Sequence, residues 1–322
     1  MDRDSDGGPD DDPPGPPSRE KGEKIDPDGD DGWDSPDGDD GNGGADLERD
    51  DHDDSNDDLF RNVGIVTLVS IGLGLAAFLV GTAVILVVAS VLLVSGIPVF
   101  DMPAVLIALS FIGLQGIGFG GVSLAYLAYR GWPSNLLQVR MPSLLDVGWV
   151  IGGFFLLYGA LFGILMLFFV IGIQPAEHDI ADSGIENPEI FLLLIPFHFL
   201  IVGPAEELMF RGIIQGKFRE YLGPIASITF ASVIFAAFHF TAYLSPNPGE
   251  IIAALSVMLL LSILLGIIYE LTDNLVVPAL IHGAYNAVQM ALLYAQESGL
   301  LGEEAMSAVL TALTSVIVAI PV

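Results

Sequence analysis

The chain has 322 residues, 52% of them hydrophobic, and a formal net charge of −29. It contains no cysteine, which excludes disulfides and any chemistry that needs a thiol nucleophile or thiolate ligand. The charge is unevenly spread, since residues 1–61 hold 24 acidic and 6 basic side chains while the other 261 residues hold 16 and 5. Two segments of different composition are therefore joined in one chain.

The first segment, residues 1–61, consists mainly of Asp, Gly, Pro and Ser. Such a segment cannot bury enough apolar surface to offset the entropy of ordering, so we predict a disordered acidic tail. It lacks the basic start and the short apolar core of a signal peptide. Solvation, tethering and docking are the roles that this composition leaves open.

The second segment, residues 62–322, is predicted to be an all-α membrane domain. A transmembrane helix needs roughly 20 mainly apolar residues, and several stretches meet that length. We predict a polytopic helical bundle of about eight transmembrane helices, of which those near 224 and 305 are the shortest. The predicted spans are 63–96, 103–129, 147–173, 189–213, 224–240, 251–271, 275–294 and 305–320.

The few basic residues predict the orientation of this bundle. Arg130 and Arg140 lie between the second and third spans, and Lys217 and Arg219 follow the fourth. Because cytoplasmic loops carry an excess of Lys and Arg, both loops are expected to be cytoplasmic. With eight spans in the cell membrane, both chain termini are then cytoplasmic. Residues 113–121, GLQGIGFGG, offer small side chains for close helix packing.

Charged residues inside an apolar run need a reason, and the segment PAEELMFRG (204–212) contains three. Glu207 and Arg211 are four residues apart and lie within about 40° of one helix face, so they can form an ion pair. Glu206 is rotated by about 100° from Glu207, so it points elsewhere. Ordinary interfacial positions at the end of a span are the alternative interpretation.

Two further segments bring polar side chains into apolar surroundings. His239 ends VIFAAFH, and His282 and Asn286 lie four residues apart in HGAYN. Each taken alone fits a packing residue or an interhelical hydrogen bond. Together they are complementary in type, because a carboxylate, two imidazoles and an amide can bind and deprotonate a water molecule. Imidazole and carboxylate are also zinc ligands, and zinc activates its bound water.

These segments resemble the motifs of a known family. EELMFR (206–211), FAAFH (235–239) and HGAYN (282–286) are similar to the EExxxR, FxxxH and HxxxN motifs of the CPBP, or Abi-type, intramembrane metalloproteases. That family includes type II CAAX prenyl endopeptidases and bacteriocin-processing and immunity proteins. The three motifs occur in the family's order within residues 190–290.

The resemblance implies a role for each matching position. It implies that Glu206 activates a water molecule, that His239 and His282 hold the water or a metal ion, and that Asn286 polarises the scissile carbonyl group. A zinc ion held by Glu206, His239 and His282 is the expected cofactor. Glu207 and Arg211 match positions where a supporting ion pair is expected.

The function expected from this resemblance is an intramembrane endopeptidase. Its substrate would be a membrane-anchored peptide or protein, cleaved near the cytoplasmic face because Glu206 lies close to the basic loop 214–223. The lipid bilayer is the other expected partner, no nucleic acid is expected, and the oligomeric state is left open. A catalytically silent immunity or scaffold protein of the same family is the alternative. A proton-coupled transporter is a third hypothesis, which inverted repeats would have supported, and none is apparent.

Overall fold

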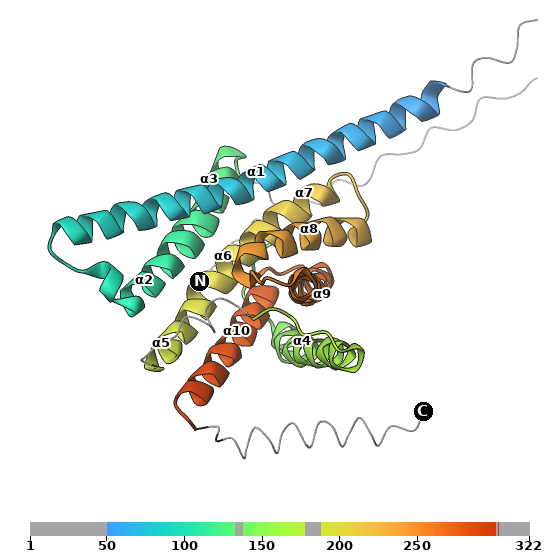
Figure 1. Cartoon of the computed structure of the whole chain (residues 1–322). Coiled ribbons are helices and arrows are strands. Elements are labelled where there is room, and N and C mark those ends of the chain that lie inside the picture. The colour runs from blue at the N-terminus through green and yellow to red at the C-terminus, as the bar shows by residue number, and fades with distance from the viewer. Residues whose placement is uncertain (1–49, 133–137, 178–187, 301, 303–322) are drawn as a thin grey trace, which may run out of the picture. The chain divides into compact units, whose positions relative to one another are not determined.

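The computed structural model describes residues 50–132, 138–177, 188–300 and 302, with side chains described from Asn56 onward. Every regular element in these ranges is helical and none is a strand, which confirms the predicted all-α fold (Figure 1). The predicted span 305–320 and most of the acidic tail lie outside the described residues.

Six long rods make up most of the described fold. Four of them are single α-helices: α1 (Asp50–Val94), α4 (Leu144–Ile171), α9 (Pro248–Thr272) and α10 (Val276–Glu297). The other two rods join α-helical and π-helical segments. One contains α2 (Pro103–Ser110), η2 (Phe111–Gly121) and α3 (Val122–Tyr129), and the other contains α5 (Glu189–Phe197), η3 (His198–Val202), α6 (Gly203–Glu207), η4 (Leu208–Gln215) and α7 (Gly216–Arg219). The short elements are η1 (Val99–Asp101), α8 (Pro224–Phe238) and η5 (Phe240–Tyr243).

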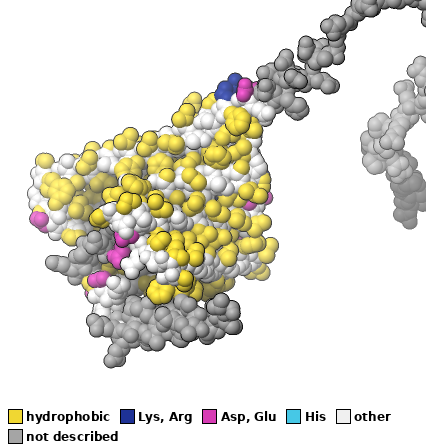
Figure 2. All heavy atoms as spheres, turned by 45° about the vertical axis from the view of Figure 1, so that its right-hand side comes forward, with side chains coloured by type: hydrophobic (Ala, Val, Ile, Leu, Met, Phe, Trp, Pro, Cys, Tyr) yellow, Lys and Arg dark blue, Asp and Glu magenta, His cyan; other side chains and the backbone are white. Residues whose placement is uncertain are grey.

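These six rods are long and apolar enough to cross a membrane, so the protein is a multi-pass membrane protein. Figure 2 shows apolar side chains over most of the visible surface, with few charged groups. The predicted count of eight spans is not confirmed. The predicted span 224–240 is α8, whose 15 residues extend only about 22 Å, less than the roughly 30 Å hydrocarbon core.

Some helices begin or end at other residues than predicted, because local capping interactions set the ends. Helix α8 stops at Phe238 and is followed by the 3₁₀ turn η5. Helix α9 then begins at Pro248, where the Asn247 side chain accepts a hydrogen bond from the Gly249 amide. Helix α1 begins at Asp50, inside the range assigned to the tail. The disorder predicted for residues 1–49 stays a prediction.

Close backbone packing joins α1 to η2. A Cβ atom added at Gly118 would lie 2.5 Å from the Ala77 carbonyl oxygen, and one added at Gly81 would lie 2.6 Å from the Cα atom of Leu114. Only glycine allows two helix backbones to come this close, as in other membrane helix pairs. The small residues of 113–121 therefore serve close helix packing, as predicted.

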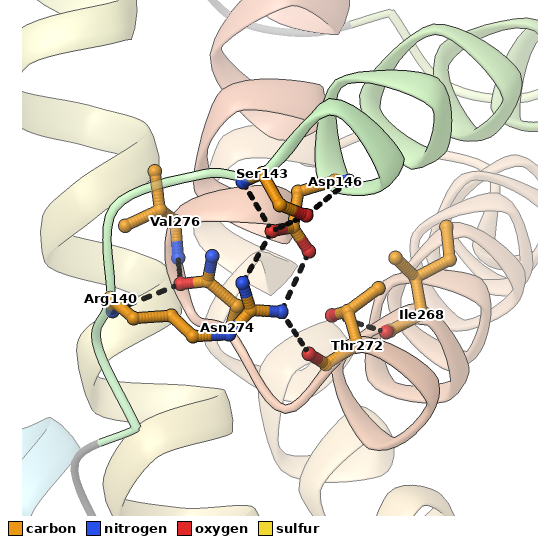
Figure 3. Close-up of polar contacts among 7 residues, drawn as sticks. All are labelled: Arg140, Ser143, Asp146, Ile268, Thr272, Asn274 and Val276. Carbon is orange, nitrogen blue, oxygen red and sulfur yellow. Dashed lines mark hydrogen bonds and ion pairs between the residues drawn. The ribbon is translucent and has the colours of Figure 1, made fainter.

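A polar clamp fixes the start of α10 (Figure 3). The Arg140 guanidinium donates to both carboxylate oxygens of Asp146 at the start of α4, and also to the Thr272 carbonyl at 3.0 Å. The Asn274 side-chain oxygen, in the turn between α9 and α10, accepts from the backbone amides of Arg140 and Val276. The segment before α4 is thereby tied to the turn from which α10 begins.

Helix α10 contacts several elements of the bundle: α4, α5, η3, α6 and α9. Its buried apolar residues include Ile281 and Tyr285 on the side of α4 and α9, and Met290 on the side of α5. Helix α10 is therefore packed against most of its neighbours along its length, and a polar side chain on it can face the interior of the bundle.

Candidate active site

Two adjacent glutamates lie near the middle of the α5–α7 rod. Glu206 and Glu207 belong to α6, whose first turn contains Pro204, and both residues are buried. Helix α6 is bounded by the π-helical segments η3 and η4. The wider π turn of η3 precedes Pro204, whose ring does not fit a regular α-helix. π-helical turns are frequent at functional sites.

Glu207 forms the predicted ion pair with Arg211. The guanidinium donates to Glu207 Oε1 at 2.9 Å, and the two side chains are 1% and 0% exposed. Arg211 also donates to the backbone oxygen and to the hydroxyl of Ser262 on α9, at 3.1 and 3.0 Å. Its guanidinium carbon lies 4.9 Å from the centre of the Phe235 ring. The buried charge is therefore balanced and its donors are used on two neighbouring helices.

His282 links this ion pair to the other glutamate. Its Nδ1 lies 2.8 Å from Glu207 Oε1. Because a carboxylate paired with Arg211 can only accept, Nδ1 is the donor. The second ring nitrogen, Nε2, lies 3.8 Å from Glu206 Oε2. Glu207 therefore sets both the orientation of the His282 ring and the nitrogen that carries its proton.

His239 approaches the same carboxylate from the end of α8. Its Nδ1 donates to the Phe235 carbonyl oxygen at 2.9 Å, since a carbonyl oxygen only accepts. Its Nε2 lies 4.0 Å from Glu206 Oε2. The side chain is 21% exposed, compared with 5% for Glu206 and 9% for His282. The site is thus most open beside His239.

Glu206 Oε2 is the point on which both imidazoles converge. This oxygen is buried and accepts no hydrogen bond from the described residues. The distances of 3.8 and 4.0 Å are too long for direct hydrogen bonds but suit a bridging molecule. A buried carboxylate oxygen needs a partner, and the Nε2 atoms of His239 and His282 both lie about 4 Å from it. Water or a metal ion would complete this arrangement.

Glu206, His239 and His282 carry the kinds of donor atom that a zinc ion binds. Two imidazoles, each with Nδ1 donating to a carbonyl or carboxylate oxygen, and one carboxylate are a suitable donor set. Ligands of a tetrahedral zinc ion lie about 3.3 Å apart, which is shorter than the measured separations. Among the described residues no trio of His, Cys, Asp or Glu is close enough to hold a metal ion as it stands. A zinc ion would require the three groups to move together by several tenths of an ångström.

Two further polar residues lie on the rods that carry this cluster: Asn286 on α10 and His198 in η3 of the α5–α7 rod. Asn286 is one turn beyond His282 on the regular helix α10 and is partly buried. It therefore shares a helix face with His282, as predicted, but no described hydrogen bond ties its amide to the other site residues. His198 is buried in η3 with its ring edge-on to Phe111.

Sequence reasoning missed the polar contacts that hold the α6–α7 segment against α9. Gln215 donates to the Gly266 carbonyl oxygen at 3.3 Å and to Glu270 at 3.0 Å, and Arg219 lies 3.2 Å from the Glu270 carboxylate. With the Arg211–Ser262 contact these form a ladder at intervals of four residues. The matching spacing of 211, 215 and 219 with 262, 266 and 270 was visible in the sequence. The contact of the Phe235 ring with His239 follows the four-residue spacing of FAAFH, but its contacts with Arg211 and His282 had no such signal.

The buried ion pair leads to a prediction on stability. Replacing Arg211 by Met leaves the Glu207 carboxylate buried without its cation, which costs about 3–5 kcal/mol when one partner of a buried pair is removed. We expect the free energy of unfolding in mixed detergent to fall by that amount. Arg61→Met, which removes an exposed pair with Asp58, is the control and should change little. Equal effects of the two substitutions would contradict the role of the pair.

Comparison with known proteins agrees with this geometry. Residues 188–288 match the family model described as type II CAAX prenyl endopeptidase Rce1-like. The uncharacterized protein YpbD of Bacillus subtilis (strain 168) is 38% identical over 116 residues, which are 35% of this chain and 53% of that relative. The chain thus spans about half the length of the curated relative it matches. No solved structure matches. The matched range contains both glutamates, Arg211, both imidazoles and Asn286, so residues 188–288 of this chain are similar to the Rce1-like family model over the whole candidate site.

Proposed function

We propose that this protein is an intramembrane endopeptidase that cleaves a membrane-anchored peptide or protein. The family match supports the reaction class. The observation that carries the proposal is the buried Glu206 Oε2, which the Nε2 atoms of His239 and His282 approach to 4.0 and 3.8 Å. A carboxylate and two imidazoles around one point can bind a water molecule and take its proton.

In the proposed reaction Glu206 is the general base. A water between Glu206 Oε2 and the imidazole Nε2 atoms donates one proton to Glu206 while its oxygen attacks the scissile carbonyl carbon. The carbonyl oxygen then carries negative charge, and the Asn286 amide is proposed to donate to it. Protonated Glu206 gives its proton to the leaving nitrogen as the carbon–nitrogen bond breaks. Water is thereby divided between the two products, and Glu206 returns to its starting state.

Glu207 and Arg211 are proposed to act through His282. Since Nδ1 of His282 donates to Glu207, its Nε2 keeps the lone pair that faces the water. Arg211 donates to the same Glu207 oxygen at 2.9 Å, so that oxygen accepts from both side chains. His239 has the same orientation through the Phe235 carbonyl. Both imidazoles thus turn Nε2 toward the shared point. A water molecule there has one hydrogen for Glu206 and one for a single imidazole, whereas a zinc ion would take a lone pair from all three groups.

Zinc fits this proposal by donor type. Glu206, His239 and His282 would hold the ion, which when bound lowers the pKa of its water to about 7. With zinc or with water alone, the hydrogen bonds from Nδ1 have the same role, because they orient Nε2 of each imidazole toward the shared point. Asn286 keeps its place as the oxyanion donor.

The proposed place of action is the cell membrane, near its cytoplasmic face. The α5–α7 rod ends at Lys217 and Arg219, and such residues favour the cytoplasmic side. Arg140 lies in the preceding basic loop. Because the chain has no cysteine, a single cysteine placed at Arg219 provides a clean probe. Labelling of that cysteine in intact cells by a membrane-impermeant reagent would contradict this orientation.

Glu206→Gln tests the proposed base directly. The amide cannot accept the proton of water, so the cleavage rate should fall by about 10²–10⁴-fold. Purified protein and a library of membrane-tethered peptides provide the assay, with fragments identified by mass spectrometry. Glu189→Gln, at an exposed position at the start of α5, is the control and should cleave normally. Normal cleavage by Glu206→Gln rejects the assignment, and an absence of cleavage by wild-type protein favours the immunity or scaffold role.

Removing zinc from the purified protein and adding it back tests whether cleavage requires the metal. If zinc is held, dialysis against a strong chelator abolishes cleavage and a stoichiometric amount of zinc restores it, while metal analysis of the purified protein finds about one ion per chain. The double variant His239→Gln/His282→Gln should then bind none. Full activity in metal-free protein would mean that Glu206 and the imidazoles act on water alone.

A further inference from the structure

The helices that carry the glutamates and His282 meet at two glycines. A Cβ atom added at Gly203 would lie 2.5 Å from the Ala279 carbonyl oxygen and 3.2 Å from the Gly283 amide nitrogen. One added at Gly283 would lie 3.1 Å from the His198 carbonyl oxygen and 3.1 Å from the Cα atom of Phe199. Two independent positions thus place α10 directly against the backbone of η3 and α6.

The partners at this crossing are mainly backbone atoms, which cannot turn aside as a side chain can. Ordinary contact begins at 3.4 Å. Alanine at Gly203 would therefore push the two helices apart by about 0.9 Å, the difference between 3.4 and 2.5 Å. Alanine at Gly283 would require a smaller movement, about 0.3 Å, from 3.1 to 3.4 Å.

The crossing lies next to the hydrogen bond that orients His282. Gly203 is one helical turn before Glu207, and Gly283 follows His282 directly. His282 Nδ1 lies 2.8 Å from Glu207 Oε1. Separation of the helices by 0.9 Å along this contact would lengthen it beyond the range of a hydrogen bond. His282 would then lose the partner that keeps the proton on Nδ1.

We propose that Gly203 and Gly283 are positioning residues, which set the distance between Glu207 and His282 and thereby the tautomer of His282. The importance of that tautomer for catalysis rests on the proposed function. The positioning itself does not, because it is a property of the folded protein before any substrate binds. Alanine at Gly203 transfers the His282 proton from Nδ1 toward Nε2, and Nε2 then no longer offers a lone pair to the point beside Glu206. Alanine at Gly283 only lengthens and weakens the hydrogen bond to Glu207.

The alternative is that Gly203 and Gly283 serve helix packing alone. Substitutions at other glycines of the bundle distinguish this packing role from the positioning role. Gly159 on α4 has no atom within 4 Å of an added Cβ, so Gly159→Ala controls for the substitution itself. Gly153 on α4 also faces α10, but its added Cβ would meet the end of the Ile281 side chain at 2.5 Å, which can move. Gly153→Ala therefore crowds the same helix without forcing its backbone away from α6.

The experiment measures the tautomer of His282 by ¹⁵N NMR of protein labelled at histidine, purified in detergent micelles. The His282 signals are identified by their loss in His282→Gln. In wild-type protein we expect a protonated Nδ1 and an unprotonated Nε2. Gly203→Ala should lose this pattern and gain the Nε2–H signal. Gly283→Ala should shift in the same direction to a smaller extent, and Gly153→Ala and Gly159→Ala should match wild type.

A wild-type His282 signal in folded Gly203→Ala overturns the proposal. If Gly203→Ala does not fold, Gly283→Val decides, because its larger side chain forces α10 further from Phe199 than alanine does, and a wild-type signal in that variant overturns the proposal equally. Where cleavage is measured, Gly203→Ala should lower kcat by roughly 10²-fold with little change in KM, as expected for a displacement of about 1 Å. Cleavage at the wild-type rate by Glu206→Gln would contradict the proposed function. The NMR result would still decide whether the two glycines position His282.

Discussion

The structure depends on burying one ion pair inside an apolar bundle. Arg211 and Glu207 are 1% and 0% exposed, and a charge in such surroundings must be balanced and hydrogen-bonded. Arg211 meets this requirement by donating to Glu207 and Ser262. Helix α9 is thereby tied to the α5–α7 rod, and the glutamate becomes a fixed acceptor in the middle of the membrane domain.

Everything proposed for the chemistry follows from that fixed acceptor. Glu207 Oε1 accepts from Arg211 and from His282, so the ion pair and the imidazole form one continuous network. Its far end is Nε2 of His282, 3.8 Å from Glu206. His239 reaches the same carboxylate through a separate helix and a separate carbonyl partner. Adjacent glutamates therefore divide two tasks, since Glu207 orients an imidazole and Glu206 faces the shared point.

Helical periodicity predicted some of this site and could not predict the rest. The four-residue spacing placed Glu207 with Arg211 and pointed Glu206 elsewhere, and the structure agrees. The direct bond from His282 to Glu207 was not expected, because it depends on how α10 crosses α6, which local spacing does not determine. The crossing in turn depends on Gly203 and Gly283. Apolar composition also predicted a span at 224–240, but the helix found there, α8, ends at Phe238 and has only 15 residues.

A double-mutant cycle on the cleavage rate tests the central claim most directly, with Glu206→Gln, His282→Gln and the variant carrying both changes. If the two side chains act on one water molecule, either substitution alone removes that activation. The double variant should then be no slower than the slower single variant. Losses that multiply would show that the two groups act independently, and would contradict the account.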